Sequence, residues 1–414
     1  MSVYDVAVVG GGASGLISAI FAAEELGSGK VIILERNDRV GKKILSTGNG
    51  RCNFTNMEIS SERYHGTDVE FILKALNKLD LNTTLEFFEK LGILARTEGK
   101  NKVFPNSLQA ASVLDMLRLK AETLGVKEEC NFKCENIYQF DEAFKLVSSS
   151  GKTIRSKKVI VACGGAAAPN MGTDGSGYSL LEKFGHKKTK LSPALVQLKC
   201  PPKSVLPMKG VKLDANVSVF VESEFVKSAF GELLFTEYGI SGPSVFDISR
   251  EASVALDNNK RVYVSVDLMP MFTKEELLAH LKQRNKNMTA DMFLNGMINK
   301  LLGKQLLKKA GVEKLNIMAY EISDDTLEKL AVILKNCRFE INGTNSWKNA
   351  QVTAGGIKTD KFNPETMESL LCSGLYACGE ILDIDGDCGG FNLQWAWSSG
   401  AVAGISASKS IKEE

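Results

Sequence analysis

The first 35 residues constrain the fold more than any other part of the chain. A short apolar, β-branched run at 4–9 is followed by glycines, a helical pattern at 15–26 and a second apolar run at 31–34. This order is typical of a βαβ unit, in which a helix connects two parallel strands. We therefore expect an α/β protein whose N-terminal region belongs to a parallel sheet.

The glycines after the first run follow the pattern G-x-G-x-x-G, with Gly10, Gly12 and Gly15. Glycine at these positions lets the chain turn tightly and approach a pyrophosphate, while the helix N-terminus supplies N–H donors. Glu35 ends the second run, where a carboxylate would bind the adenosine ribose and disfavour a 2′-phosphate. The combination predicts a dinucleotide site; the alternative is a glycine-rich turn in an ordinary α/β protein.

Two later segments indicate which dinucleotide is bound. VIVACGGAAAP at 159–169 reads as a buried strand that leads into a Gly-Gly turn. The segment at 374–408 runs from a strand through acidic residues and Gly389-Gly390 into a helix, whose N-terminus would face an anionic flavin edge. Three elements of this kind favour FAD over NAD.

The rest of the chain predicts an inserted domain. We expect flanking helices at 68–91 and 108–124, the second with Ser107 as N-cap, and an antiparallel meander at 132–155. Alternating strands at 194–199, 217–221 and 261–267 then precede helical patterns at 274–334. The expected architecture is a Rossmann-like FAD/NAD(P)-binding domain built from both chain ends, 1–192 and 347–414. The insert at 193–346 would be β-rich over 193–270 and helical over 271–346.

Composition argues against several classes of partner. A net charge of +2 without a long basic run gives no argument for a nucleic-acid or anionic-membrane partner. No secretory leader pattern and no apolar run long enough for a membrane span is present, so we expect a cytoplasmic protein. We expect its partner to be a small-molecule substrate, and no sequence feature specifies an oligomeric state.

No metal site or dithiol centre is expected. The nine cysteines lie scattered in apolar segments without a C-x-x-C pair, which indicates reduced, buried thiols. The acidic string Asp383, Asp385 and Asp387 lacks the terminal glutamate of a calcium-binding EF-hand loop.

Three longer motifs resemble those of the bacterial HI0933-like flavoprotein family, which is similar in turn to other two-dinucleotide-binding flavoproteins. They are TGNGRCN at 47–53, GISGP at 239–243, and GLYACGEILDIDGDCGGFN at 374–392. The resemblance covers essentially the whole chain. It implies FAD bound without a covalent link.

The resemblance also implies a set of cofactor-binding residues. The glycine turn and helix start would bind the pyrophosphate, Glu35 would lie at the ribose, and a second loop would contact FAD, with Lys43 or Arg51 placing positive charge near phosphate. Strand ends and the C-terminal motif would complete the site, with Gly379, Glu380 and Asp383 at the ribityl and phosphate region and the last three residues of the set bordering the isoalloxazine. The set comprises Gly10, Gly12, Ala13, Ser14, Gly15, Glu35, Arg36, Lys42, Lys43, Gly48, Asn49, Gly50, Arg51, Cys52, Asn53, Ala162, Gly164, Gly379, Glu380, Asp383, Gly390, Asn392 and Leu393.

No catalytic acid or base stands out. Glu237 and Tyr238, on a turn of the insert, and Cys52 are weak candidates; a solvated turn and a packing thiol are the alternatives. The family pattern has histidine where this chain has Glu237, so a role tied to that histidine is in doubt. His65, His186 and His280 lie outside the flavin motifs and are expected to be structural. Trp395 and Trp397 are expected in the core rather than on the cofactor.

The resemblance implies several activities. The preferred hypothesis is an NAD(P)H-dependent reductase of conjugated enones such as 3-oxo bile acids or steroids. The alternatives are an oxidase of a small amine such as aminoacetone, which uses oxygen, and a flavoprotein with an RNA- or protein-binding role. The insert has no second G-x-G-x-x-G after a strand, so NAD(P)H as co-substrate would dock transiently at the flavin face.

Overall fold

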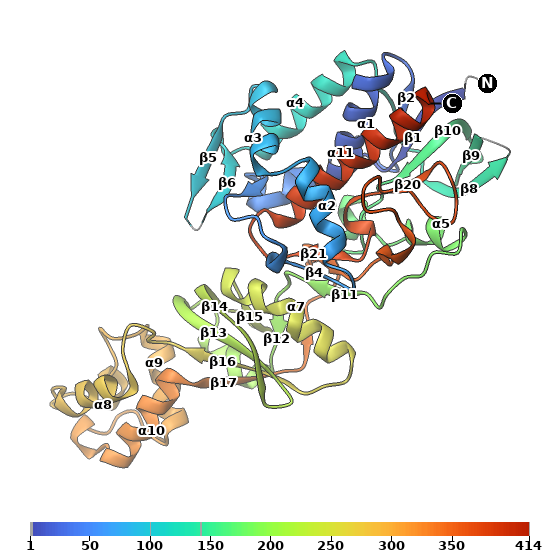
Figure 1. Ribbon diagram of the computed structural model, residues 1–414. Coiled ribbons are helices and arrows are strands. Elements are labelled where there is room, and N and C mark those ends of the chain that lie inside the picture. Colours follow the sequence, from blue (N-terminus) through green and yellow to red (C-terminus); the bar gives the residue numbers. More distant parts are fainter. Residues whose placement is uncertain (1–2, 100, 141–142, 414) are drawn as a thin grey trace. The chain divides into compact units, whose positions relative to one another are not determined.

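The computed structural model describes residues 3–99, 101–140 and 143–413, and it divides into two compact units (Figure 1). Unit 1 comprises Met1–Leu191 with Gln351–Glu414, and unit 2 is the continuous segment Ser192–Ala350. The insertion that the sequence predicts, at 193–346, lies within this segment. Unit 1 is therefore assembled from both ends of the chain.

Unit 1 is a Rossmann-like α/β domain around a seven-stranded sheet of order β7-β2-β1-β10-β9-β8, with β20 beside β10. The strands β7, β2, β1, β10 and β20 run parallel, and β9 and β8 are antiparallel. The bounds are β1 Val3–Val9, β2 Val31–Leu34, β7 Lys127–Glu129, β8 Cys134–Phe140, β9 Ala143–Ser148, β10 Thr153–Val161 and β20 Leu375–Ala377.

Strand β10 belongs to two parts of this sheet at once. Its first half, from Thr153 to Ser156, pairs antiparallel with β9, and its second half, Val159 to Val161, pairs parallel with β20. Along nearly its whole length it also pairs with β1. The third meander strand and the following buried strand, which the sequence suggested as separate elements, are one continuous strand.

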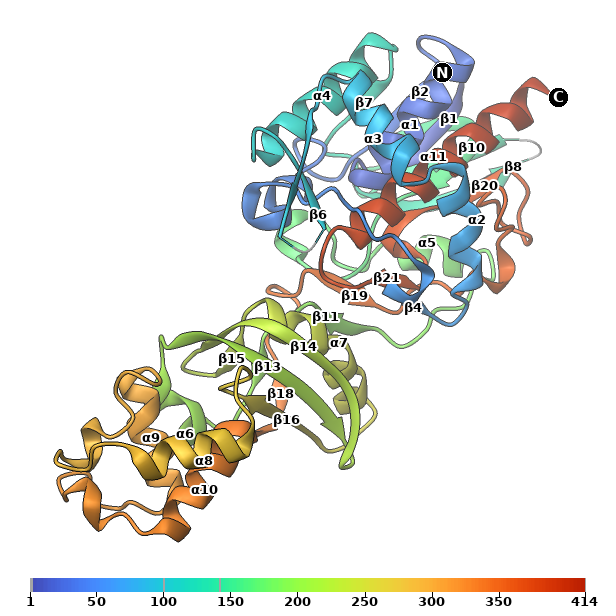
Figure 2. The same cartoon turned by 60° about the vertical axis from the view of Figure 1, so that its left-hand side comes forward.

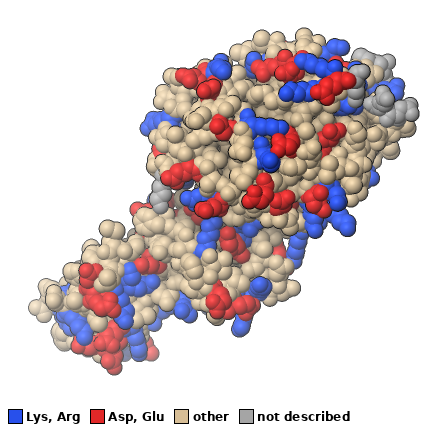
Figure 3. Space-filling model, in the orientation of Figure 1, with Lys and Arg blue, Asp and Glu red and all other residues tan. Residues whose placement is uncertain are grey.

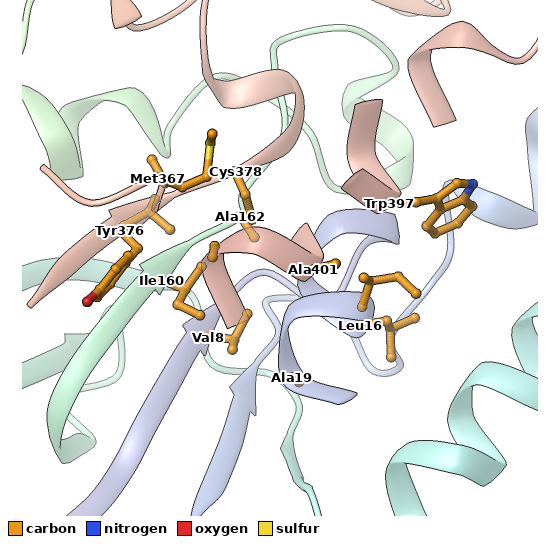
Figure 4. Close-up of a cluster of buried hydrophobic side chains, with 14 of the residues drawn as sticks. Val8, Leu16, Ala19, Ile160, Ala162, Met367, Tyr376, Cys378, Trp397 and Ala401 are labelled. Atoms are coloured by element: carbon orange, nitrogen blue, oxygen red, sulfur yellow. The ribbon is translucent and has the colours of Figure 1, made fainter. Parts of the chain in front are cut away.

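The helices of unit 1 cover this sheet, and two of them pack unusually close together. Helix α1 (Ala13–Leu26) lies against α11 (Phe391–Lys412), the last helix of the chain. A Cβ on Gly400 would lie 2.5 Å from the carbonyl oxygen of Ser14, and one on Gly404 would lie 2.3 Å from that of Ser18. Figure 4 shows the core beside this contact, with Val8 and Leu16 from the N-terminal region near Tyr376 and Ala401 from the C-terminal region. The N-terminal βαβ unit therefore shares its core with the C-terminal segment.

Two helix predictions need correction. The helical pattern at 68–91 forms two helices, α2 (Glu70–Lys78) and α3 (Leu81–Lys90), because Asp80 caps α3 by accepting a hydrogen bond from Thr83 N at 2.8 Å. The N-cap of α4 (Ala110–Thr123) is Gln109, so the assignment of Ser107 was wrong. The Ser107 hydroxyl instead donates to Ser112 Oγ at 3.1 Å.

Smaller elements complete unit 1. Helix α5 spans Tyr178–Glu182. Strands β3 (Thr55–Asn56), β6 (Lys102–Pro105) and β5 (Ala95–Glu98) form one antiparallel sheet, and β4 (Tyr64–Gly66) pairs with β21 (Ile384–Gly386). The pairing of β4 with β21 holds the segment after residue 53 against the C-terminal motif. Strand β19 spans Val352–Ala354.

Unit 2 is built on a second seven-stranded sheet, of order β17-β16-β13-β14-β15-β12-β18. Alternate residues of β13, such as Val217 and Val219, pack on Val245 and Ile248 of helix α7, which covers one face (Figure 2). Three further helices follow β16. The bounds are β11 Ser192–Ala194, β12 Leu198–Lys199, α6 Pro202–Val205, β13 Lys212–Val221, β14 Glu224–Phe235, β15 Gly239–Ser241, α7 Pro243–Asp257, β16 Val262–Asp267, α8 Lys274–Gln283, α9 Lys300–Ala310, α10 Asp324–Lys335, β17 Cys337–Ile341 and β18 Gly343–Thr344.

Candidate flavin-binding site

Two glycines of the G-x-G-x-x-G turn are required because the protein's own backbone lies too close for a Cβ. Gly10 has φ +105°, and a Cβ on it would lie 2.5 Å from the carbonyl oxygen of Ala162. A Cβ on Gly15 would lie 1.9 Å from the carbonyl oxygen of Gly10, so only glycine lets α1 lie this close to the end of β1. Glycine is therefore needed at both positions for the fold alone, whatever the turn binds.

Gly12 is different, because nothing in the protein explains it. It is the N-cap of α1 with φ −80°, a value open to any residue, and a Cβ on it would meet no atom within 4 Å. The open space lies at the N-terminus of a helix, where free N–H groups favour an anion. This cradle fits the pyrophosphate of a dinucleotide, since a side chain at residue 12 would fill it.

Glu35 ties this turn to the end of β2. Its carboxylate accepts hydrogen bonds from Gly11 N at 2.8 Å and from both the backbone N and the Nδ2 of Asn37, each at 2.8 Å. The side chain is 7% exposed. A carboxylate offers about four acceptor positions, so three protein bonds leave one for a ribose hydroxyl. Glu35 thus lies where the sequence placed it and also has a structural role that the sequence did not suggest.

The loop at 42–53 adopts an uncommon backbone conformation. Gly48, Asn49, Gly50 and Cys52 all have φ between +56° and +81°, a region that residues other than glycine rarely adopt. Oδ1 of Asn53 is buried and has no hydrogen-bond partner among the residues that the structure describes. A compact loop with an unsatisfied acceptor is typical of a binding segment rather than a simple connection.

The three cations of the expected FAD-contacting loop all have carboxylate partners. Lys42 pairs with Asp38 at 2.7 Å, and Arg51 pairs with Glu98 at 2.9 Å while its guanidinium lies over Phe104. Lys43 Nζ lies 2.9 Å from Glu380 Oε2, which joins the loop to the C-terminal motif. The positive charge that we expected near phosphate is therefore locally compensated.

Three residues of the C-terminal motif make contacts that fix this motif within unit 1. A Cβ on Gly379 (φ +76°) would lie 2.4 Å from Ser14 Oγ, so glycine here lets the motif pack directly on the start of α1. Asp383 accepts hydrogen bonds from the backbone N and the hydroxyl of Thr67. The Asn392 side chain both accepts from Gly386 N at 2.8 Å and donates to Gly386 O at 2.7 Å. The side-chain amide of Asn392 therefore stabilises the loop between Gly386 and Asn392.

The remaining expected cofactor residues lie on the same elements. Ala13 starts α1, and Arg36 follows β2. Ala162 continues β10 by donating from its N–H to Val9 O at 2.8 Å, and Gly164 (φ +71°) forms the turn beyond it. Gly390 (φ +103°) is the N-cap of α11, and Leu393 lies half-buried in its first turn. All the residues expected at the cofactor belong to unit 1.

The weak catalytic candidates gain little support. Cys52 is fully buried, and this burial raises the pKa of its thiol to about 12, so a packing role is favoured over a reactive thiolate. Glu237, on the turn between β14 and β15, is exposed and pairs with Lys209 at 2.6 Å. That lysine lowers the pKa of Glu237, which makes it a poor proton donor near neutral pH. Tyr238 is half-buried, and its carbonyl accepts from Cys200 N.

Both tryptophans lie in the core, as predicted. Trp395 Nε1 donates to Gly379 O at 3.1 Å, and Trp397 Nε1 donates to Phe54 O at 2.8 Å. Both side chains are at most 1% exposed. His186 is also buried, stacked on Phe362 and hydrogen-bonded to Ser369 Oγ at 2.8 Å, while His65 pairs with Asp387. These contacts are structural.

Two organising residues were not identified from the sequence. The Gln394 amide, fully buried in α11, accepts from Thr55 and donates to Leu79 O, Thr84 and Ser398. A lone glutamine among aromatic and small residues was a usable signal. The Thr353 hydroxyl accepts from the backbone N of Ala166 at 2.8 Å and of Ala167 at 3.0 Å, a contact with no local sequence signal.

In the described part of the chain, no group of three or more His, Cys, Asp or Glu side chains is placed to hold a metal ion. None of the helices described is both long enough and apolar enough to cross a membrane.

Comparisons with known proteins agree with this architecture. The family model described as "HI0933-like protein Rossmann domain" matches residues 4–406. The chain is 38% identical over 408 residues to a 3-dehydro-bile acid delta(4,6)-reductase from Clostridium scindens, covering 98% of this chain and 99% of the relative. It is 30% identical to a ribosomal RNA dihydrouridine synthase from Haemophilus influenzae, covering 97% and 98%.

Among solved structures, 3-ketosteroid delta1-dehydrogenase from Sterolibacterium denitrificans superposes with a TM-score of 0.54 at 10% identity, over 99% of this chain and all of the other. That likeness concerns the fold alone. The family match and the full-length relative decide the assignment: the chain belongs to the HI0933-like family and has its Rossmann-like FAD-binding fold.

Proposed function

We propose that this FAD-dependent oxidoreductase is a reductase that uses NAD(P)H to saturate a carbon–carbon double bond conjugated to a carbonyl group. The observation that carries the proposal is the 38% identity, over nearly the full length of both chains, to a 3-dehydro-bile acid delta(4,6)-reductase. The name of that relative describes a substrate in which double bonds at positions 4 and 6 extend from a 3-oxo group. A conjugated 3-oxo steroid is therefore the first substrate to test.

The protein's own residues fit the binding of the cofactor rather than the chemistry of the reaction. Bound FAD would supply hydride transfer, which requires orientation more than an acid–base pair from the protein. The open space at Gly12 would receive the pyrophosphate, and the remaining acceptor position of Glu35 would bind a ribose hydroxyl. The NAD(P)H site is proposed at the flavin face, because neither unit contains a second glycine turn of this type after a strand.

The test is to follow the visible absorbance of the oxidised flavin without oxygen. NADH or NADPH should bleach it, and a conjugated 3-oxo steroid should then restore the colour and be recovered with its double bond saturated. The matched control is the same steroid already saturated, which should leave the flavin bleached. Bleaching by aminoacetone but by neither nicotinamide, with peroxide released on adding oxygen, would overturn the proposal in favour of an amine oxidase.

A second candidate is the reduction of uracil in RNA, favoured by the full-length relative named as a ribosomal RNA dihydrouridine synthase. The chemistry is similar, because the double bond that is lost in dihydrouridine is also conjugated to a carbonyl. One part of unit 2, residues 282–314, is rich in basic side chains: Lys282, Arg284, Lys286, Lys300, Lys304, Lys308, Lys309 and Lys314 against Asp291 and Glu313. On the face drawn in Figure 3, however, basic and acidic side chains are interspersed. The small enone therefore remains the first choice.

The two candidates are separated by giving the reduced enzyme each substrate in turn. Ribosomal RNA without dihydrouridine should fail to restore the flavin colour, and digestion of that RNA should release no dihydrouridine. Reoxidation by the RNA but not by the steroid would select the second candidate. A triple variant of α9, Lys300→Glu with Lys304→Glu and Lys308→Glu, would then lose RNA turnover while still being bleached by the nicotinamide.

A further inference from the structure

A segment after β10 folds against the end of β2 and is joined to it by an ion pair. Arg36 Nη1 lies 2.6 Å from Asp174 Oδ1, and the two side chains are 30% and 33% exposed. The same Arg36 nitrogen lies 3.4 Å from Ser176 Oγ. One residue further along, Asn37 Nδ2 lies 3.5 Å from the carbonyl oxygen of Met171. Residues 169–176 are thus attached through two consecutive residues that follow Glu35.

Asp174 is held in place by more than the arginine. Its Oδ1 also accepts from the backbone N of Ser176 at 3.1 Å and from the Ser176 hydroxyl at 2.6 Å. Burial alone would raise the pKa of this carboxyl, but the hydrogen bonds from Arg36 and Ser176 outweigh it and keep the pKa well below the usual range. Asp174 is therefore a fixed anion across the pH range in which the protein is used, unlike a freely rotating surface carboxylate.

The backbone of the segment is shaped for this approach. Gly172 has φ +103°, a conformation that favours glycine, and a Cβ there would lie 2.3 Å from Asn37 Nδ2, so that a side chain would displace Asn37. Ala168 has φ +60°, an unfavourable value for a residue with a Cβ. Left-handed residues at both points turn the chain back toward β2.

The attachment is continuous with the ribose position. Asn37 donates two hydrogen bonds to Oε1 of Glu35, and the other oxygen of that carboxylate accepts from Gly11 in the glycine turn. Glu35 is where the adenosine ribose is expected, and Arg36 and Asn37 carry the contacts from there to Asp174 and Met171. The glycine turn, β2 and residues 169–176 therefore form one hydrogen-bonded structure at this end of the sheet.

We infer that residues 169–176 form an adenosine clasp, with Asp174 and Asn37 as positioning residues that hold this segment beside the adenosine half of bound FAD and slow its release. The inference rests on the proposed FAD binding. Because the contacts lie at the ribose end of the site, the clasp distinguishes adenine nucleotides from flavin mononucleotide.

The test compares Asp174→Asn with Asp38→Asn. Asp38 pairs with Lys42 at 2.7 Å only four residues away, so this control removes a similar charge near β2 without touching the clasp. On dilution, the fluorescence of released flavin should rise about tenfold faster for Asp174→Asn than for the wild type, because a charge-assisted hydrogen bond is lost. Asp38→Asn should stay within about twofold of the wild type, as is usual for an exposed pair. High salt should speed release from the wild type more than from Asp174→Asn.

A second measurement separates the clasp from general loosening of unit 1. In the apoprotein, Asp174→Asn should weaken ADP binding while leaving FMN binding unchanged. Equal release rates in all three proteins, or equal weakening of ADP and FMN, would overturn the clasp. If Asp174→Asn does not fold, Ser176→Ala removes one hydrogen bond to the same carboxylate and should show a smaller effect in the same direction. A wild-type protein that holds no FAD would instead overturn the proposed function.

Discussion

The backbone N–H of Gly11 donates a hydrogen bond to Oε2 of Glu35 at 2.8 Å, and this bond fixes the glycine turn to the end of β2. The carboxylate therefore stabilises the protein's own turn and would also bind a ribose hydroxyl there. Its other oxygen accepts two hydrogen bonds from Asn37, so the position of residues 36 and 37 depends on it too.

Glu35→Ala is expected to weaken FAD and also to lower the stability of the apoprotein. Hydrogen bonds to a charged group contribute about 1.5–3 kcal/mol, so the loss of the ribose bond alone corresponds to roughly tenfold or more in FAD affinity. Equilibrium dialysis with FAD and urea unfolding of the apoprotein measure the two effects. Weaker FAD with an unchanged apoprotein would show that the bond from Gly11 contributes nothing to stability.

Gly12→Val and Gly15→Val should fail in different ways. At residue 12 the new side chain meets only open space, so the protein should fold with its normal melting temperature but be colourless. At residue 15 a Cβ would lie 1.9 Å from a backbone oxygen, which should cost about 3 kcal/mol or more of folding stability. Thermal unfolding and flavin content after acid release measure both. Normal FAD in a folded Gly12→Val protein would contradict the pyrophosphate assignment.

Cys52→Ser should retain turnover. The thiol is fully buried and its pKa is about 12, so it remains protonated at neutral pH and has no role as a thiolate. A buried hydroxyl in its place should cost on the order of 1–3 kcal/mol in stability. The measurement is turnover per bound FAD, with Cys200→Ser as a buried control in unit 2. Loss of turnover in the Cys52 variant with FAD still bound would restore the redox interpretation.

His186 should make stability depend on pH in the mildly acidic range. Burial lowers the pKa of this histidine to about 4, whereas the unfolded chain has the ordinary value near 6.5. The unfolded state therefore binds the proton more readily, and stability should fall as pH decreases from about 6.5 to about 4, by on the order of 3 kcal/mol. Below that range this group causes no further loss.

His186→Gln removes the titrating group while keeping a polar side chain beside Ser369. Urea unfolding at a series of pH values should show a flatter dependence between pH 6.5 and 4 for the variant than for the wild type. Superimposable curves would show that His186 is not the group responsible.

The N-terminal βαβ unit could be predicted because its signals are local. The glycine spacing, the helix and the acid at the end of β2 lie within 35 residues, and the structure places β1, α1 and β2 within two residues of the expected bounds. The break between α2 and α3 also had a local signal, since Asp80 caps the second helix, but the continuous apolar spacing obscured it. Local signals thus explain why the βαβ unit was predicted, and a local signal was also present at the break between α2 and α3 that was overlooked.

The hairpin that joins β14 to β13 was missed for a different reason. Its turn consists of Glu222 and Ser223, which have φ +49° and +77°. A two-residue turn of this kind usually contains glycine, asparagine or aspartate. The sequence has glutamate and serine there, so it gives no signal for the turn. The pairing of Lys43 with Glu380, 337 residues apart, and of Arg36 with Asp174 had no local signal either. Such contacts exist only once the fold has formed, so spacing along the chain could not supply them.

The close packing of α11 on α1 determines the order in which the protein can be completed during synthesis. Helix α1 is made long before α11, so the backbone of Ser14 and Ser18 meets Gly400 and Gly404 only after all the residues between them have been synthesised. All of Ser192–Ala350 is made in between, so unit 2 has its full sequence before unit 1 does. Until then, the apolar face of α1 has no permanent cover and is a surface for chaperones or for aggregation. A chain truncated before Phe391, where α11 begins, should therefore contain a folded unit 2 attached to an incomplete unit 1.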